Sequence, residues 1–180
     1  MTASRMKANV GMADRERLLA AAAPTTPVTV VEVSALRGLT IRQPWADAVA
    51  YLGKDVENRT RRTTYTGPVL IHAGLQVDKA ALSHAPAALA DAAGELPGVL
   101  GAVIAVSRIT GAHACDGSCS PWAEPGRWHW QLAGTRVLSS PVTVKGALGL
   151  WIPTPALRAL VTRCRGFLPA SPNSQGASGP

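Results

Sequence analysis

Aromatic residues other than tryptophan are scarce in this sequence, which has one Phe and two Tyr beside five Trp in 180 residues. A core built on phenylalanine is therefore excluded, and Leu, Val, Ile and the tryptophans must form it. Hydrophobic residues make up 47% of the chain, although much of that share is alanine. A chain of this length is sufficient for one independently folding domain with tails.

Cysteine is also scarce, since the chain has only Cys115, Cys119 and Cys164. This odd count does not favour a disulfide framework and indicates a reducing compartment. No apolar run reaches the length of about 20 residues that a membrane-spanning helix needs. The apolar stretch at residues 18–23 is too short for a signal peptide. We therefore expect a cytoplasmic protein without a membrane partner.

Acidic residues are outnumbered, because 11 Asp and Glu stand against 18 Lys and Arg, with a net charge of +7 and a pI near 10.0. The excess lies in two blocks, residues 37–63 and residues 108–165, whereas the segment between them is net acidic. This distribution favours an anionic partner, and nucleic acid is the leading candidate.

The two ends of the chain lack a periodic apolar pattern. Residues 1–34 end in an extended linker and residues 166–180 are rich in Pro, Ser and Gly, so we expect two disordered tails around a domain at residues 35–165. Alternation, apolar periodicity and Gly or Pro breaks predict the elements inside it. We expect strands at residues 35–41, 54–60, 67–74, 98–114, 127–138 and 141–151, and helices at residues 43–53, 77–93 and 154–164. Strands outnumber helices without regular alternation, which favours an α+β fold with a curved or closed sheet.

The stretch QPWADAVAYLGKDVENRTRR, residues 43–62, places a charged cluster directly after a short apolar helix. Lys54, Glu57 and Arg59 combine a carboxylate with two cations, which can activate water, stabilise an oxyanion or hold a phosphate. The alternative is a solvated ion-pair ladder that contributes little to stability. Trp45 is either a core residue on its helix or a base-stacking platform. Arg61 and Arg62 suit phosphate contact or an exposed loop.

The cysteines and histidines follow the spacing H-x-C-x3-C at residues 113–119, and only His129 could complete a metal site. Structural zinc sites normally have tighter ligand pairs, so we expect no metal. A nucleophile pair of Cys119 and His129 is left open. In WHW, residues 128–130, the two tryptophans share one strand face, and His129 is expected to point to a cleft or to solvent.

The segment LTIRQPWADAVAYLGKDVENRTRRTTYTGPVLIHAG, residues 39–74, resembles the start of an ASCH domain, a PUA-like family named for activating signal cointegrator homology. The family motif is G-x-K-x-x-E-x-R. Lys54, Glu57 and Arg59 match its charged positions, whereas its glycine is displaced by one place to Gly53. The preceding Q-P-W and the following G-P-V-L-I-H-A also match. The segments CSPWAEPGRWHWQL and PVTVKGALGLW resemble the closing strands of bacterial members, so the resemblance covers residues 37–153.

This resemblance implies a small PUA-like β-barrel ringed by a few helices, with a cleft lined by the motif. It also implies RNA- or nucleotide-related work in the cytoplasm. Some relatives bind nucleic acid, some cleave RNA, and a short bacterial branch hydrolyses N4-acetylcytidine with a Lys, a Thr and a Glu. Lys54 and Glu57 are therefore the candidate catalytic residues. The candidate ligand-binding residues are Arg42, Gln43, Trp45, Arg59, Arg61, Arg62, Tyr65 and His129.

Three functions remain open at this point. In the first, the protein is an RNA- or nucleotide-binding module whose basic blocks attract phosphates and whose cleft accepts a flipped or terminal base. In the second, it is a metal-independent hydrolase of RNA or of a modified nucleoside, with Glu57 as base, Lys54 as stabiliser and Arg59 as clamp. In the third, it is a partner-binding scaffold. We expect an RNA or nucleotide ligand, no cofactor and a monomer.

Overall fold

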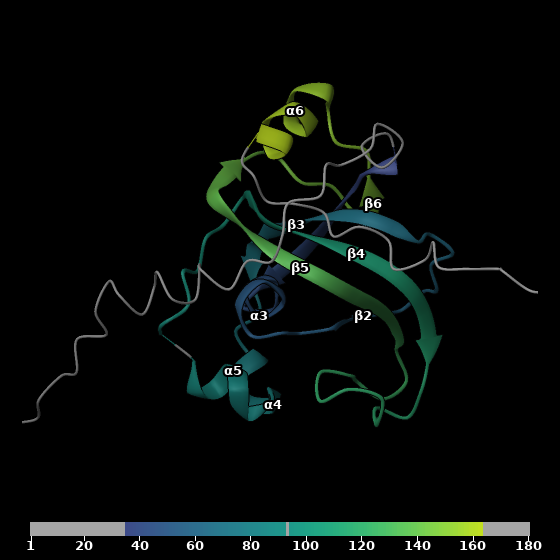
Figure 1. Cartoon of the computed structure of the whole chain (residues 1–180). Helices are drawn as coiled ribbons and strands as arrows, with labels where there is room; N and C mark the ends of the chain where they lie inside the picture. The colour runs from purple at the N-terminus through teal and green to yellow at the C-terminus, as the bar shows by residue number, and fades with distance from the viewer. Residues whose placement is uncertain (1–34, 93, 164–180) are drawn as a thin grey trace, which may run out of the picture.

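The computed structural model describes residues 35–92 and 94–163, so the two expected tails and Cys164 lie outside the described residues (Figure 1). The expected α+β class is confirmed, and the domain boundaries stay a prediction. In chain order the described elements are β1 (Arg37–Gln43), α3 (Trp45–Tyr51), β2 (Val56–Arg59), β3 (Gly67–Val77), α4 (Ala81–His84), α5 (Ala87–Asp91), β4 (Ala102–Ala114), β5 (Trp128–Thr143), β6 (Leu150–Trp151) and α6 (Pro155–Arg163).

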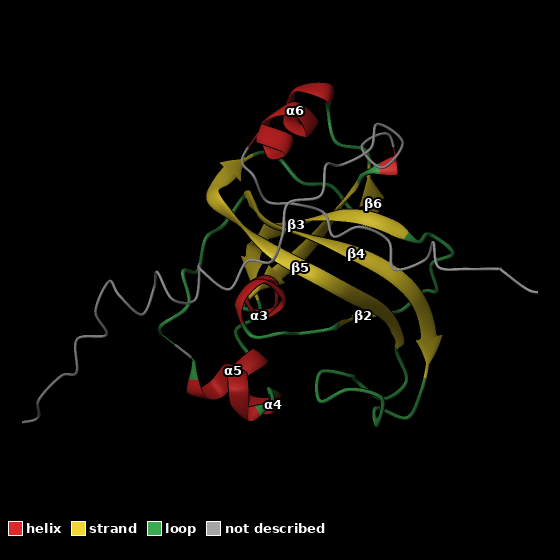
Figure 2. Cartoon of the chain, in the orientation of Figure 1, coloured by secondary structure: helices red, strands yellow, loops and turns green. Residues whose placement is uncertain are grey.

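The six described strands form one sheet in the order β2-β5-β4-β3-β1-β6 (Figure 2). Strand β1 runs parallel to β3, whereas the pairs β1–β6, β3–β4, β4–β5 and β2–β5 are antiparallel. Within the described residues, β2 and β6 are the two edges and the sheet is open. Register shifts interrupt the ladder between the long, curved strands β4 and β5, as expected where β-bulges bend a sheet.

Apolar residues cover both faces of the central strands, and each face has its own core. Val69 and Ile71 of β3 pack with Val49 of α3, whereas the intervening Leu70 packs with Leu157 of α6. In Figure 1, α6 lies above the sheet and α4 and α5 lie below it. The register of β3 is therefore strongly specified, because a slip of one residue would exchange the two sets of side chains.

Glycine and proline lie at the ends of the helices α3, α4 and α5. Helix α3 ends at Tyr51, and Gly53 follows with a φ of 71°, which residues with a side chain adopt at a cost. The chain then turns directly into β2. Pro86 separates α4 from α5, as the sequence predicts, because proline cannot continue a helix through its own nitrogen.

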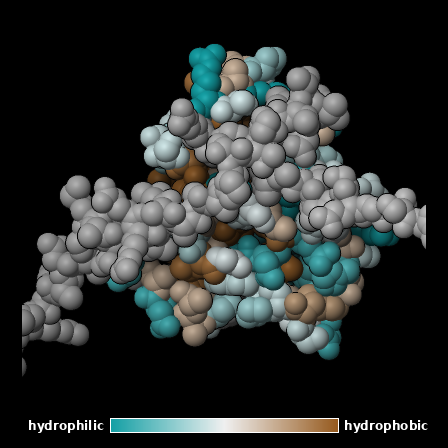
Figure 3. Space-filling view, viewed as in Figure 1, coloured by the Kyte–Doolittle hydropathy of each residue, from teal (hydrophilic) through white to brown (hydrophobic). Residues whose placement is uncertain are grey.

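The outer surface mixes polar and apolar residues. Hydrophilic and hydrophobic side chains lie next to one another on the described part of the face seen in Figure 3. None of the helices in the described ranges combines the length and the apolar character needed to cross a membrane.

Candidate functional site

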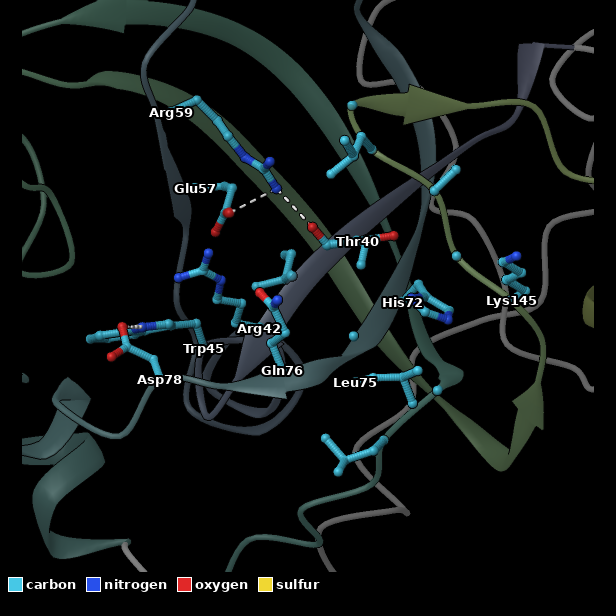
Figure 4. Close-up of a pocket in the computed structure, with 18 of the residues that line it drawn as sticks. Thr40, Arg42, Trp45, Glu57, Arg59, His72, Leu75, Gln76, Asp78 and Lys145 are labelled. Atoms are coloured by element: carbon cyan, nitrogen blue, oxygen red, sulfur yellow. Dashed lines mark hydrogen bonds and ion pairs between the residues drawn. The ribbon is translucent and has the colours of Figure 1, made fainter.

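A cavity of about 950 Å³ is lined by residues of β1, β2 and β3 (Figure 4). Its wall combines the start of α3, the charged residues of β2, the second half of β3 and the segment at residues 143–149. The charged side chains in its described lining are Arg42, Lys54, Arg59 and Lys145 together with Glu57, Asp78 and Glu124. The cavity is therefore a mixed-charge site and not a uniformly basic groove.

The predicted cluster of Lys54, Glu57 and Arg59 forms a continuous chain of charges in this wall. One oxygen of Glu57 lies 3.5 Å from Nζ of Lys54, and the other lies 3.0 Å from Nη2 of Arg59. The side chain of Lys54 is 2% exposed and that of Glu57 is 10% exposed. A solvated ion-pair ladder is therefore wrong as a description of this cluster, because two of its three charges are withdrawn from water.

Backbone contacts hold the cluster in place. Lys54 also donates from Nζ to the carbonyl of Val56, and Arg59 donates from Nη2 to the carbonyl of Thr40 at 2.9 Å (Figure 4). Glu57 and Arg59 share one face of β2, as strand alternation requires. The guanidinium of Arg59 lies 5.6 Å from the ring centre of Trp130, within the range of a cation–π contact. Glu57 and Arg59 are thus held on β2, and Lys54 is held in the loop directly before it.

Trp45 packs against two of the hydrophobic clusters and also lines the cavity, and base stacking by its ring stays a prediction. Nε1 donates to Asp78 at 3.0 Å, and Nζ of Lys54 lies 5.9 Å from the ring centre. The ring orientation is therefore set by a hydrogen bond at one edge, which leaves an aromatic surface beside the charged cluster.

His72 is a cavity residue that sequence reasoning missed. Its Nε2 donates to the carbonyl of Val144 at 2.9 Å, because a carbonyl oxygen can only accept. Nδ1 is buried and has no hydrogen-bond partner among the described residues. A signal for this residue was present in the sequence, because His72 is a single polar side chain inside the apolar run of β3. A buried histidine is expected either to have hydrogen-bond partners or to have a function.

The segment at residues 143–149 closes the cavity against β1 and β3, and Gly146 makes this possible. A Cβ at Gly146 would lie 2.5 Å from Nδ1 of His72 and 2.6 Å from Oγ1 of Thr40. Glycine therefore lets the backbone approach both side chains. Lys145 lies beside His72 in Figure 4, whereas Arg42 extends into the cavity on the side of Trp45 and Glu57.

Other predicted binding residues lie outside this lining. Gln43 is buried and supports α3, since its side chain donates to Asp47 at 2.8 Å and accepts from the backbone of Asp47 at 3.1 Å. The hydroxyl of Tyr65 lies 2.7 Å from the carbonyl of Pro68 and 2.9 Å from that of Ala35. These contacts give Gln43 and Tyr65 structural roles.

Arg61 and Arg62 are exposed in the segment after β2, close to the cavity but not in its wall. Trp130 donates from Nε1 to the carbonyl of Arg61 at 2.9 Å, and the guanidinium of Arg62 lies 5.7 Å from the ring centre of Trp128. Their exposed position is compatible with contact to a phosphate chain that leaves the cavity, which stays a prediction.

His129 does not point to the cavity or to solvent, contrary to the sequence-based expectation. It is fully buried at the start of β5, beside Cys115 and Cys119. A hydrogen bond shared with Cys119 lowers the pKa of the Cys115 thiol to about 6, and the same bond raises the pKa of Cys119. These residues form a second cluster, separate from the lining of the cavity.

No protein-family model matches the chain, and no curated protein matches it either.

Proposed function

We propose that the protein binds RNA or a nucleotide through this cavity, with the K-x-x-E-x-R cluster as its polar wall. The observation that carries the proposal is the ion-pair chain of Lys54, Glu57 and Arg59 beside the ring of Trp45, in which Lys54 and Glu57 are buried. Charges buried at a cavity wall add little net stability compared with apolar packing. Such groups are therefore candidates for ligand recognition.

The chemistry of the wall suits a nucleobase. Glu57 offers an acceptor for base N–H groups, Arg59 and Lys54 offer donors, and Trp45 offers an aromatic face for stacking. Leu75, Leu100 and Leu148 are exposed and line another part of the cavity, where they can contact the planar faces of a ligand. The volume of about 950 Å³ lies within the usual range for small-molecule sites of about 300–1,000 Å³.

Exposed cations suit the phosphates of the same ligand. Arg42 and Lys145 line the cavity from opposite sides, and both are exposed. The net charge of +7 supports an anionic ligand. The resemblance of residues 37–153 to ASCH domains supports the same function, and we propose on that basis that the open sheet is the described part of a PUA-like barrel.

The geometry favours binding over hydrolysis. A general base needs a carboxylate oxygen that can take a proton from the attacking group. Both oxygens of Glu57 instead contact cations, at 3.5 and 3.0 Å. A nucleobase N–H needs only a remaining lone pair on either oxygen, whereas a general base would also have to take up a proton beside these two cations.

A titration that also measures turnover tests this function. Labelled single-stranded RNA and single nucleotides are added to the full chain with EDTA present, and the RNA is recovered and sized afterwards. N4-acetylcytidine is included as a second potential substrate. We expect saturable binding with intact RNA and intact acetylcytidine. Turnover would replace the binding proposal with a hydrolase, and the absence of any binding would leave only the scaffold hypothesis.

A further inference from the structure

Four potential metal ligands meet at the end of the β4–β5 pair, outside the lining of the cavity. One ligand atom from each of His113, Cys115, Cys119 and His129 lies within 4.8 Å of the other three. The sequence analysis predicted no metal here, because the spacing H-x-C-x3-C-x9-H contains no tight ligand pair. The fold brings the four residues close together, although their spacing in the sequence does not show this.

Strand register brings the two histidines together. His113 of β4 lies directly opposite His129 of β5 in the antiparallel ladder, so both side chains emerge on one face of the sheet. Their ring centres are 5.6 Å apart. Cys115 follows immediately after β4, and the loop at residues 115–127 returns Cys119 to the same place. Each cysteine has its Sγ 3.3 Å from Nδ1 of His129.

A hydrogen bond to a backbone carbonyl favours the tautomer of His129 that can bind a metal through Nδ1. Nε2 lies 2.8 Å from the carbonyl oxygen of Glu124, and a carbonyl can only accept, so Nε2 carries the proton. In the neutral ring, which is the form that binds metals, Nδ1 then presents its lone pair to the two sulfur atoms. Metal-binding histidines are commonly oriented in this way, by a carbonyl or carboxylate at the other ring nitrogen. The ring is also fully buried, which restricts its movement.

We propose that His113, Cys115, Cys119 and His129 bind one zinc ion in a closed, structural site. Zinc binds Cys sulfur at about 2.3 Å and His nitrogen at about 2.0 Å in a tetrahedron, which places the donor atoms about 3.3–3.8 Å from one another. The two sulfur–nitrogen distances of 3.3 Å already match this geometry. Four protein ligands leave no open position for a substrate, as in structural rather than catalytic zinc sites.

A disulfide between Cys115 and Cys119 is the competing state of the same two sulfur atoms. Their Sγ atoms are 2.6 Å apart, closer than two ligands of one zinc ion, so metal binding must separate them by about 1 Å. A disulfide would use both sulfurs and leave Nδ1 of His129 without a metal. The two states differ in metal content, in thiol count and in mass, so one preparation can distinguish them.

The test uses the full chain, expressed without a His-tag and purified under reducing conditions without chelator. We expect one zinc ion per chain by elemental analysis, and loss of two alkylatable thiols relative to the chelated, unfolded protein. Replacement of zinc by cobalt should give the absorption bands of a tetrahedral cobalt–thiolate site. A metal-free protein with reactive thiols would overturn the proposal, and so would a reductant-sensitive Cys115–Cys119 disulfide without metal.

Variants locate the ion. Cys119→Ser and His129→Asn should each lose most of the zinc, whereas Cys164→Ser is the matched control and should retain it. Zinc that persists at full stoichiometry in both ligand variants would place the ion elsewhere and overturn the assignment. If the ligand variants do not fold, the cobalt spectrum of the unmodified chain decides, because thiolate-to-cobalt bands require cysteine ligands and their absence refutes the site. This inference does not depend on the ligand of the cavity.

Discussion

Asn58 of β2 lies directly opposite His129 of β5, so the strand that carries the charged cluster pairs with the strand that carries the buried histidine. The amide of Asn58 donates to the carbonyl of Trp122 at 2.9 Å and accepts from the backbone of Glu124 at 3.1 Å. Glu124 in turn accepts from Nε2 of His129 through its carbonyl. The loop at residues 115–127 therefore connects the cluster of His113, Cys115, Cys119 and His129 to the Asn58 side chain of β2.

Ser120 anchors this loop, and its removal should loosen it. The Ser120 hydroxyl donates to Asp55 at 2.5 Å and accepts from the backbone of Trp122 at 3.1 Å. Ser120→Ala should lower the free energy of unfolding by about 0.5–1.5 kcal/mol, because the exposed Asp55 carboxylate and the Trp122 amide each lose a hydrogen-bond partner. Urea unfolding measures the loss, and limited proteolysis should show faster cleavage within the loop. The matched control is Ser118→Ala at an exposed position, and equal effects of the two variants would contradict this role.

Phosphate contact predicts a defined response to salt. Each Lys or Arg that neutralises a phosphate of single-stranded nucleic acid contributes a slope of about −0.7 to the logarithmic dependence of the binding constant on salt. If Arg61 and Arg62 both contact phosphates, changing the pair to Ala should reduce the slope by about 1.4. Arg163→Ala, at the end of α6, is the control and should leave the slope unchanged. A binding constant that does not depend on salt would refute phosphate contact altogether.

Much of the secondary structure could be predicted from local patterns, whereas the complete site could not. Lys54, Glu57 and Arg59 were predictable as a cluster because they share one turn and one short strand, where spacing determines which side chains meet. His72, Thr40 and Lys145 reach the cavity from separate segments, so their proximity depends on the pairing of β1 with β3 and on the path of residues 143–149.

The cluster of His113, Cys115, Cys119 and His129 was identified from the sequence but not expected to bind a metal, for a related reason. Its four residues converge only because β4 and β5 pair in a register that places His113 opposite His129. A sequence specifies that register through packing on both faces of the sheet, and ligand spacing alone does not show it. The same argument applies to His129. The alternation of side chains along β5 was predicted correctly, but the residues that surround His129 were not.

Gly146 should be intolerant of even one methyl group. A Cβ there would meet the His72 ring at 2.5 Å and Oγ1 of Thr40 at 2.6 Å. Gly146→Ala should therefore lower the free energy of unfolding by about 1–3 kcal/mol, as overpacking does, and weaken ligand binding by moving residues 143–149. Gly111→Ala is the control, because its Cβ would meet only the end of the Gln131 side chain, at 3.0 Å. Thermal melts and RNA titrations measure both effects, and an unchanged Gly146→Ala protein would show that this segment moves freely.

Glu57→Gln separates the functional hypotheses most directly. The substitution keeps the size of the side chain but removes the charge that compensates Lys54 and Arg59. Breaking a buried ion pair on one side typically costs about 3–5 kcal/mol, so we expect a measurable loss of stability in urea unfolding. Glu95→Gln, at an exposed position, is the matched control and should unfold like the unmodified chain.

Binding and turnover measured on the folded Glu57→Gln protein then distinguish nucleobase recognition, hydrolysis and a purely structural role for Glu57. If Glu57 accepts hydrogen bonds from a nucleobase, affinity for RNA should fall by about 10–100-fold, because a hydrogen bond to a charged group is worth about 1.5–3 kcal/mol. A hydrolase would instead lose turnover by about 100-fold or more with little change in binding, as expected when a general base is removed. If neither binding nor turnover changes while stability falls, Glu57 is a structural residue, and the cavity wall is not the recognition site.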